Sequence, residues 1–175
     1  MMARSAADLR AAFDRAFSEP PRAQRPASLD LLAVRLRGAP FALPLAAVAG
    51  VFADKPLTRL PAAAPDFLGL AGFRGSVVPV YDLAALLGYA VEGAPRWLVV
   101  AEGAAVALAF DGFDGYLKLP PDRIARPAPG EPSRAHVHEL ARSADGTLRP
   151  LVDLASVLAV IRQRARQDLI PPRQE

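Results

Sequence analysis

Short apolar runs separated by turn residues dominate the pattern of hydrophobic and polar positions along the chain. Glycine, proline or aspartate stands between consecutive runs, which is typical of β-strands joined by tight turns. No long central helical pattern interrupts the series, so we predict an all-β fold built from small barrels. The predicted strands lie at residues 29–36, 40–45, 77–81, 97–101, 106–110, 116–119 and 148–152.

One stretch of this pattern occurs twice. RGSVVPVYDLAALL at residues 74–87 aligns without gaps with DGTLRPLVDLASVL at residues 145–158. Each copy contains a glycine turn, an apolar strand that carries a proline, and an Asp-Leu pair. Because an Asp side chain accepts hydrogen bonds from the free N–H groups of a first helical turn, we predict that Asp82 and Asp153 cap two short helices.

The repetition continues upstream. GAPFALPLAAVAGVF at residues 38–52 aligns with GAAVALAFDGFDGYL at residues 103–117. Two blocks in the same order indicate a duplicated module of about 60 to 70 residues, which is longer than the solenoid repeats. A barrel of that size has a marginal core, so we predict that two barrels, at about residues 29–90 and 95–158, pack against each other.

The two ends of the chain have helical patterns. Leu9, Phe13 and Phe17 recur at helical spacing within residues 5–18, and this stripe packs either on the chain's own domain or on a partner. A proline-rich linker follows this helix, and the helix and linker together span residues 1–28. We predict a folded body over residues 29–161. A C-terminal helix begins at Leu154, and residues 162–175 form its end and a tail.

Composition limits the possible classes of protein. The chain of 175 residues is 52% hydrophobic with a net charge of +3, which permits an acidic partner without requiring one. Zero cysteines exclude disulfides and thiolate chemistry. Neither a signal-peptide pattern nor an apolar run long enough for a membrane span is present, so we predict a cytoplasmic protein without direct membrane insertion.

The residues needed for catalysis or cofactor binding are missing from the sequence. His136 and His138 are the only histidines, and a zinc site needs three or four ligands, so we interpret them as loop or core residues. The stretch at residues 111–115 lacks the further oxygen ligands of a calcium loop. No glycine-rich phosphate motif or nucleophile elbow occurs. We therefore predict no enzyme activity, no cofactor and no metal.

Several motifs occur in an order that resembles a known family. They are GVF at residues 50–52, LTRLP at 57–61, FLGLAGFRGSVVPVYDL at 67–83 and VALAFDGFDGYLKLPPDRI at 106–124. Together they resemble the CheW-like adaptor domains of bacterial chemosensory systems. The most specific piece is the N-[LI]-R-G-x-[VI]-[VI]-P-[VI]-x-[DN]-L signature, which is matched from Phe73 onward and departs at Gly72, where the family usually has Asn.

The resemblance implies a fold and a set of partners. It implies two SH3-like five-stranded barrels that share a hydrophobic seam, here with the N-terminal and C-terminal helices added. It also implies a non-catalytic adaptor that is recruited to receptor arrays. One surface would bind the regulatory domain of a CheA-type histidine kinase, and another the cytoplasmic hairpin tip of a chemoreceptor.

The resemblance also assigns residues to each surface. The kinase-binding residues would be Val48, Gly50, Val51 and Leu57, and the receptor-binding residues would be Leu45, Arg74, Gly75 and Trp97. Arg74 is the strongest candidate, because a guanidinium can donate several hydrogen bonds to carbonyls or carboxylates. Alternatively, Arg74 is a solvated turn residue, Val48, Val51 and Leu57 belong to a barrel core, and Trp97 is buried.

Two further hypotheses remain. Most family members have a polar residue in place of Gly50 and an Asn in place of Gly72, which favours a divergent adaptor that binds only one of the two partners. Small basic barrels also bind nucleic acid. With 7% aromatic residues and no arginine-rich strand interleaved with stacking rings, however, we expect no nucleic-acid partner.

Overall fold

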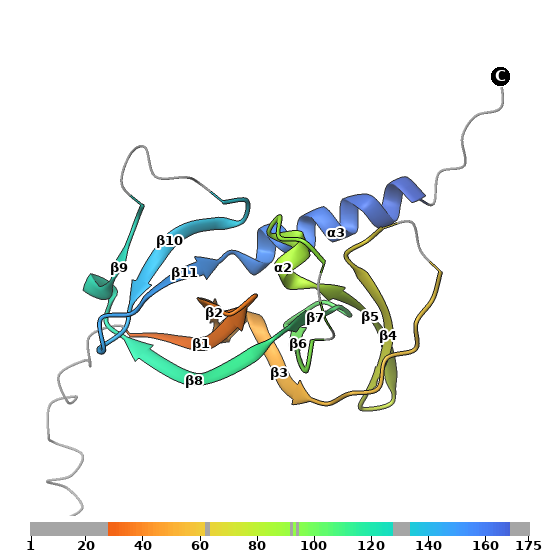
Figure 1. The fold of residues 1–175 in the computed structure, drawn as a ribbon, viewed down its shortest axis with the longest axis horizontal. Coiled ribbons are helices and arrows are strands. Elements are labelled where there is room, and N and C mark those ends of the chain that lie inside the picture. The colour runs from red at the N-terminus through yellow and green to blue at the C-terminus, as the bar shows by residue number, and fades with distance from the viewer. Residues whose placement is uncertain (1–27, 62–63, 92, 94, 128–133, 169–175) are drawn as a thin grey trace, which may run out of the picture.

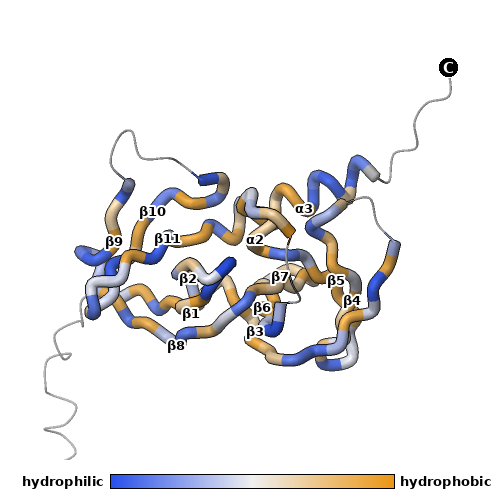
Figure 2. The backbone as a smooth tube through the Cα atoms, in the orientation of Figure 1, coloured by the Kyte–Doolittle hydropathy of each residue, from blue (hydrophilic) through white to orange (hydrophobic). Residues whose placement is uncertain are grey.

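The computed structural model describes residues 28–61, 64–91, 93, 95–127 and 134–168, which form two β-sheets and a long C-terminal helix (Figure 1). The predicted N-terminal helix at residues 5–18 lies outside the described residues. Hydrophobic residues concentrate in the strands, and hydrophilic residues in the turns between them (Figure 2). The short apolar runs in the sequence therefore form strands, as predicted.

The first sheet has six strands in the order β8-β1-β2-β11-β10-β9. Hairpin β1–β2 turns at Arg37 and Gly38, whose φ angles of 50° and 75° allow a tight two-residue connection. This is the hairpin predicted at the start of the folded body. The strands are β1 (Leu29–Leu36), β2 (Ala39–Pro44), β8 (Gly112–Leu119), β9 (Ile124–Ala125), β10 (Val137–Arg142) and β11 (Leu148–Val152).

The second sheet has five strands in the order β3-β6-β7-β5-β4. All its neighbouring strands are antiparallel except β5 and β7, which are parallel. The strands are β3 (Val48–Ala53), β4 (Phe67–Phe73), β5 (Ser76–Asp82), β6 (Trp97–Ala101) and β7 (Ala107–Phe110).

In both sheets, the chain that leaves the first strand in the order crosses to the opposite end of the sheet and bonds there. After β3, the Thr58 N–H donates to the Leu70 carbonyl of β4 at 2.8 Å, and the Leu70 N–H donates back at 2.9 Å. After β8, the two-residue strand β9 pairs with β10. Gly69 is required at the first closure, because its φ is +130° and an added Cβ would lie 2.3 Å from the Thr58 carbonyl oxygen.

The predicted duplication appears as two sheets that exchange hairpins. β5 of the first copy pairs in parallel with β7 of the second copy, with Val80 opposite Ala107. At the equivalent repeat positions, β11 of the second copy pairs in parallel with β2 of the first, with Leu151 opposite Ala42. Each copy thus gives its first hairpin to the sheet of the other.

This exchange corrects the predicted division of the folded body. The second sheet contains all the strands between Val48 and Phe110, and the first sheet contains the strands before and after them. The sheets are therefore not divided at residues 29–90 and 95–158. The physical reason is that both hairpins consist of short apolar runs that are buried on both faces, so either copy's remaining strands can accept them.

The two matched aspartates cap helices, as predicted. The Asp82 side chain accepts from the Ala84 and Ala85 N–H groups at 3.0 and 3.3 Å, at the start of α2 (Leu83–Leu86). The Asp153 side chain accepts from the Ser156 N–H at 3.1 Å, at the start of α3 (Leu154–Asp168). Each capping bond of this kind stabilises a helix by about 1 kcal/mol.

The core has three layers, because the side chains of each strand alternate between two faces. Leu32 of β1 belongs to a large cluster between the two sheets, whereas its neighbour Leu31 belongs to the first sheet's own cluster. A third cluster, around Phe73 and Val80, lies on the opposite face of the second sheet. Burying one such leucine or phenylalanine contributes about 1.5–3 kcal/mol.

The predicted C-terminal helix is present as α3, which begins beside the first sheet and extends over the second (Figure 1). Its apolar residues Leu154, Val157, Leu158 and Ile161 are buried between the sheets. Beyond Ile161 the helix presents exposed arginines over the second sheet. It therefore joins the two halves through its first turns and leaves its last turns accessible.

Candidate functional site

Strand β3 carries three of the residues assigned to kinase binding. It lies at one end of the second sheet and pairs with β6, so its other edge has no partner strand in the described chain. Val48 and Val51 are half-buried and pack against the cluster between the sheets. An added Cβ on Gly50 would lie 3.0 Å from the Phe52 ring. The strand therefore presents a partly accessible apolar surface, and its backbone at Gly50 lies close to the Phe52 ring.

Leu57, the fourth assigned kinase residue, is also half-buried. Its side chain packs against the second sheet's own cluster together with Phe52 and Leu68. Thr58 then makes the closing bridge to β4. Leu57 is therefore held in place next to the Thr58 bridge. A substitution of Leu57 would change the core as well as any binding surface.

Arg74 and Gly75 form the tight turn between β4 and β5. Their φ angles are 47° and 84°, which places the turn in the left-handed region that glycine adopts without strain. Both residues are exposed, and within the described chain the Arg74 side chain makes no hydrogen bond or ion pair. Val77, two residues after Gly75, is 68% exposed. The turn presents one unpaired cation beside an exposed apolar side chain.

Trp97 lies at the start of β6 within a row of aromatic rings. It stacks on Phe110 with the ring centroids 6.4 Å apart, and the tilted ring of Phe113 has its centroid 5.3 Å from that of Trp97. The row continues to Tyr116, which is 64% exposed. Trp97 itself is half-buried, as is Leu45 in the short 3-10 helix Leu45–Ala47 before β3.

The residues assigned to the two partners lie close together. Ala53 at the end of β3 pairs with Trp97. The Phe52 ring lies 4.8 Å from the ring of Phe73, the residue that precedes Arg74, and the Lys55 ammonium group lies about 5.5 Å from both rings. The end of β3 therefore joins the Arg74 turn to the Trp97 row.

Sequence reasoning missed Phe113 and Tyr116. Both follow Phe110 in the stretch FDGFDGY, which suggested a metal loop and β-turns. Phe113 and Tyr116 are three residues apart, which in a regular strand would place them on opposite faces. Their rings meet because the register between β1 and β8 shifts between Ala33 and Val34, which the sequence pattern did not indicate. The structure adds these two rings to the surface that contains Trp97.

A polar junction connects the two sheets behind these surfaces. Arg37, in the β1–β2 turn, donates to Asp82 at 2.6 Å, to Asp111 at 3.0 Å and to the Ala90 carbonyl at 3.1 Å. Burial opposes the charge of Arg37, but hydrogen bonds and charge attraction from Asp82 and Asp111 dominate, so the pKa of the guanidinium lies above its ordinary value. The Asp82 side chain is 2% exposed.

Asp114 on β8 lies between two arginines. Arg35 donates to one carboxylate oxygen at 2.8 Å, and Arg149 to the other at 3.0 Å. Burial alone would raise the pKa of Asp114, but the hydrogen bonds and charges of the two guanidinium groups outweigh it and lower that pKa. The carboxylate therefore stays ionised in the folded protein at neutral pH.

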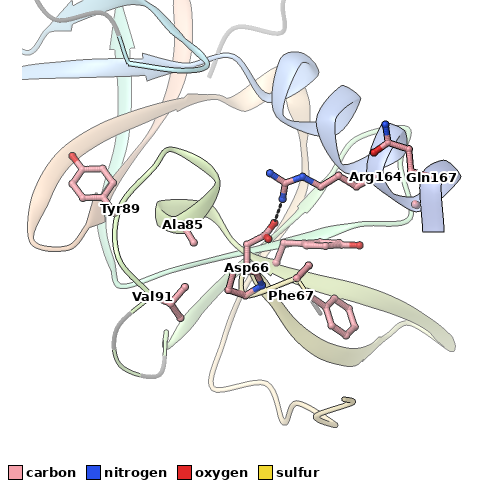
Figure 3. Close-up of a pocket in the computed structure, with 11 residues that line it drawn as sticks. Asp66, Phe67, Ala85, Tyr89, Val91, Arg164 and Gln167 are labelled. Atoms are coloured by element: carbon pink, nitrogen blue, oxygen red, sulfur yellow. Dashed lines mark hydrogen bonds and ion pairs between the residues drawn. The ribbon is translucent and has the colours of Figure 1, made fainter. Parts of the chain in front are cut away.

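A groove lies under the exposed end of α3, on the side of α2 (Figure 3). It has a volume of about 770 Å³ and is lined by residues from four separate segments. Arg164 of α3 and Asp66, just before β4, form an ion pair of 2.8 Å across it. None of the residues assigned to kinase or receptor binding lines this groove. The lining is Ala64, Pro65, Asp66, Phe67, Tyr81, Ala85, Tyr89, Val91, Arg164, Ala165 and Gln167.

The two histidines are separate from these surfaces. His136 has a φ of 63°, and its ring Nδ1 lies 2.5 Å from the Ser156 hydroxyl near the start of α3. His138 is exposed on β10. In the described chain, no group of three or more His, Asp or Glu residues is arranged to hold a metal ion. No described helix is long and apolar enough to cross a membrane.

Comparison with known proteins places this arrangement in a family. The model of the CheW-like domain matches residues 30–162, which is most of the chain. The crystal structure of the scaffolding protein TtCheW from Thermoanaerobacter tengcongensis superposes with a TM-score of 0.63 at 20% sequence identity, and covers 72% of this chain and 89% of that one. No curated protein sequence matches the chain. The extent of the family match shows that the chain belongs to the CheW-like domain family.

Proposed function

We propose that this chain is a non-catalytic adaptor that couples chemoreceptor tips to a CheA-type histidine kinase within a cytoplasmic receptor array. Membership of the CheW-like family supports a scaffolding role in a chemotaxis system. In this proposal the two closed sheets are the SH3-like barrels of the family. Their function is to hold docking surfaces in a fixed relation.

The observation that carries the receptor part of the proposal is the free guanidinium of Arg74. An exposed arginine without an intramolecular partner keeps its hydrogen-bond donors for another molecule. The adjacent Val77 and Gly75 leave the turn open, since an added Cβ at Gly75 would contact nothing within 4 Å. A helical hairpin could approach this turn and extend toward Trp97.

The kinase part of the proposal rests on the accessible edge of β3. Ala49 is exposed at the bulge between Val48 and Gly50, beside the half-buried Val51. An apolar partner surface could cover this strand without displacing the core. The proximity of β3 to the Arg74 turn would place kinase and receptor side by side on the adaptor.

Two charge-introducing substitutions test the proposal in pull-down experiments with the kinase and receptor encoded beside this chain. Arg74→Glu should reduce receptor binding at least tenfold, which corresponds to about 1.4 kcal/mol, and leave kinase binding intact. Ala49→Arg should have the opposite effect, because the new charge lies in the kinase surface and outside the core. Both positions are exposed, so the fold should be preserved.

Arg142→Glu is the matched control, since Arg142 is exposed on β10 of the other sheet and lacks a recorded partner among the described residues. It should leave both partners bound. If Arg74→Glu binds the receptor as the control does, the assigned receptor surface is wrong.

A second candidate function is a divergent adaptor that binds only one of the partners. Gly50 and Gly72 both lack the polar side chain found in most members. An added Cβ at Gly72 would contact nothing within 4 Å, whereas one at Gly50 would approach the Phe52 ring. The receptor surface thus has open space for the missing side chain, whereas at the kinase surface the Phe52 ring would have to shift by a few tenths of an ångström. If the unmodified chain binds the receptor alone, this second function holds.

A further inference from the structure

A second groove lies on the outer face of the first sheet, and we name it the β9–β10 pocket. It has a volume of about 660 Å³ and is lined by the 3-10 helix Pro121–Arg123, by β9 and β10, and by the first residue of β11. This part of the molecule is remote from the second sheet (Figure 1). The residues assigned to the kinase and the receptor lie instead on or next to β3, the β4–β5 turn and β6. A ligand in this pocket would therefore contact neither assigned surface.

The strand register determines which side chains face the β9–β10 pocket. Leu140 pairs with Ala125 of β9, and Arg142 pairs with Leu148 of β11. Ala141, between Leu140 and Arg142, is buried in the first sheet's own cluster. Because side chains alternate along a strand, the two pairs point away from that cluster and toward solvent. Leu148 is 47% exposed, so the floor of the pocket is accessible apolar surface.

The walls of the β9–β10 pocket are cationic. Arg123, Arg126 and Arg142 line it, are exposed, and make no hydrogen bond or ion pair with other described residues. The register between β9 and β10 places Arg123 and Arg142 at opposing positions, one residue beyond the last recorded pair. Like charges that oppose each other across two strands destabilise the pairing. The lining contains one acid, Asp122, so three guanidinium groups are set against a single carboxylate.

We propose that the β9–β10 pocket binds an extended acidic segment of a third partner protein. Two carboxylates of that segment would accept hydrogen bonds from the three guanidinium groups. An aliphatic side chain of the segment would cover Leu140 and Leu148. Binding would also remove the repulsion between Arg123 and Arg142, which the described chain leaves uncompensated.

An extended segment fits this place because β9 is the last strand in the order of its sheet. Its outer edge has no partner strand in the described chain, so its backbone can pair with an added strand. Alternate side chains of such a strand would then point into the pocket. None of the residues that line the pocket is aromatic, so the bases of a nucleic acid would have no ring on which to stack.

The described chain begins near the pocket, but the residues before it have the wrong charge to fill it. Leu29 pairs with Leu119, two residues before the 3-10 helix that lines the pocket. Residues 1–27 contain five arginines and three acidic residues, so their net charge is positive. The charge of the pocket therefore favours a separate acidic protein over this segment.

The test uses the full chain and two synthetic peptides. In both, alternate positions carry a charged residue, a leucine and a second charged residue, with serine between them. The charged residue is glutamate in one peptide and lysine in the other. Fluorescence anisotropy should show that the glutamate peptide binds about tenfold more tightly than the lysine peptide. The double variant Arg126→Glu/Arg142→Glu should reverse this order, and Leu148→Ser should weaken binding of the glutamate peptide.

Arg162→Glu/Arg166→Glu is the matched control, because it makes the same change of charge at exposed positions of α3. It should keep the preference for the glutamate peptide, and circular dichroism should confirm that each variant is folded. An equal loss of the glutamate peptide in both double variants would overturn the proposal, because overall charge would then explain the binding. Equal affinity of the unmodified chain for the two peptides would also overturn it.

Three further outcomes would assign the pocket to another ligand and so overturn the proposal. The first is loss of kinase or receptor binding by Arg126→Glu/Arg142→Glu. The second is a single-stranded oligonucleotide that binds more tightly than the glutamate peptide and loses affinity in that variant. The third is a gain in peptide affinity on Glu131→Gln, because the chain's own loop between β9 and β10 would then be the occupant.

Discussion

The junction at Arg37 offers a sharp test of how the two sheets are held together. In Arg37→Met the aliphatic part of the side chain is retained and the charge is removed. The Asp82 carboxylate, 2% exposed, would lose its 2.6 Å ion pair and keep only its bonds to the first turn of α2. Removing one member of a buried ion pair costs about 3–5 kcal/mol, because the remaining charge is uncompensated.

We expect the lower end of that range, about 3 kcal/mol, since Asp82 keeps its capping bonds. For a chain of this size that corresponds to a fall in Tm of about 6–12 °C. Urea denaturation followed by the fluorescence of Trp97, the only tryptophan, measures the free energy of unfolding. Arg96→Met is the matched control, because Arg96 and Asp54 form an ion pair in which both side chains are more than half exposed. If the two variants lose equal stability, the junction does not hold the sheets together.

Two further predictions concern acid stability and the closure of the second sheet. Because the folded-state pKa of Asp114 lies below its ordinary value of 3.8, its contribution to stability is complete above that pH and is lost as the pH falls through the folded-state pKa. The unfolding free energy of Asp114→Asn, measured by urea titration, should therefore depend less steeply on pH between about 4 and 2 than that of the unmodified chain. An unchanged slope would contradict the assignment. Gly69→Ala should cost about 3 kcal/mol of unfolding free energy, whereas Gly72→Ala, with open space around it, should change it by less than about 0.5 kcal/mol. Equal effects of the two alanines would show that the approach of Thr58 to Gly69 is not restrictive.

Local features of the fold could be predicted from the sequence because neighbouring residues determine them. The Arg37–Gly38 turn, the helix caps at Asp82 and Asp153, and the apolar start of α3 all depend on chemistry within a few positions. The duplication was also visible, because it is a comparison of the sequence with itself. The family was indicated separately, by the order of the motifs at residues 50–52, 57–61, 67–83 and 106–124.

The exchange of hairpins could not be predicted in this way. The β1–β2 and β6–β7 hairpins are both made of continuous apolar runs, so pairing β5 with β2 satisfies the local pattern as well as pairing it with β7 does. Only the packing of complete sheets separates the two possibilities.

The candidate surfaces could be predicted from the sequence only in part. Arg74 is exposed and unpaired among the described residues, as a binding residue should be, and its role in receptor binding stays a prediction. Leu57 and Val51 pack partly into the core, which apolar spacing alone could not distinguish from surface use. The groove under α3 was missed, because Asp66, Tyr89 and Arg164 come together only in the folded chain.

The crossed pairing of the two copies has a consequence for biosynthesis. The β1–β2 hairpin leaves the ribosome first, yet its final neighbour β11 is among the last strands to be made. Until then the β2 edge of the hairpin has no partner strand, and so distant a contact forms slowly. A nascent chain that stalls before Leu148 would expose this hairpin to chaperones and proteases, so the cell would accumulate either the whole adaptor or none of it.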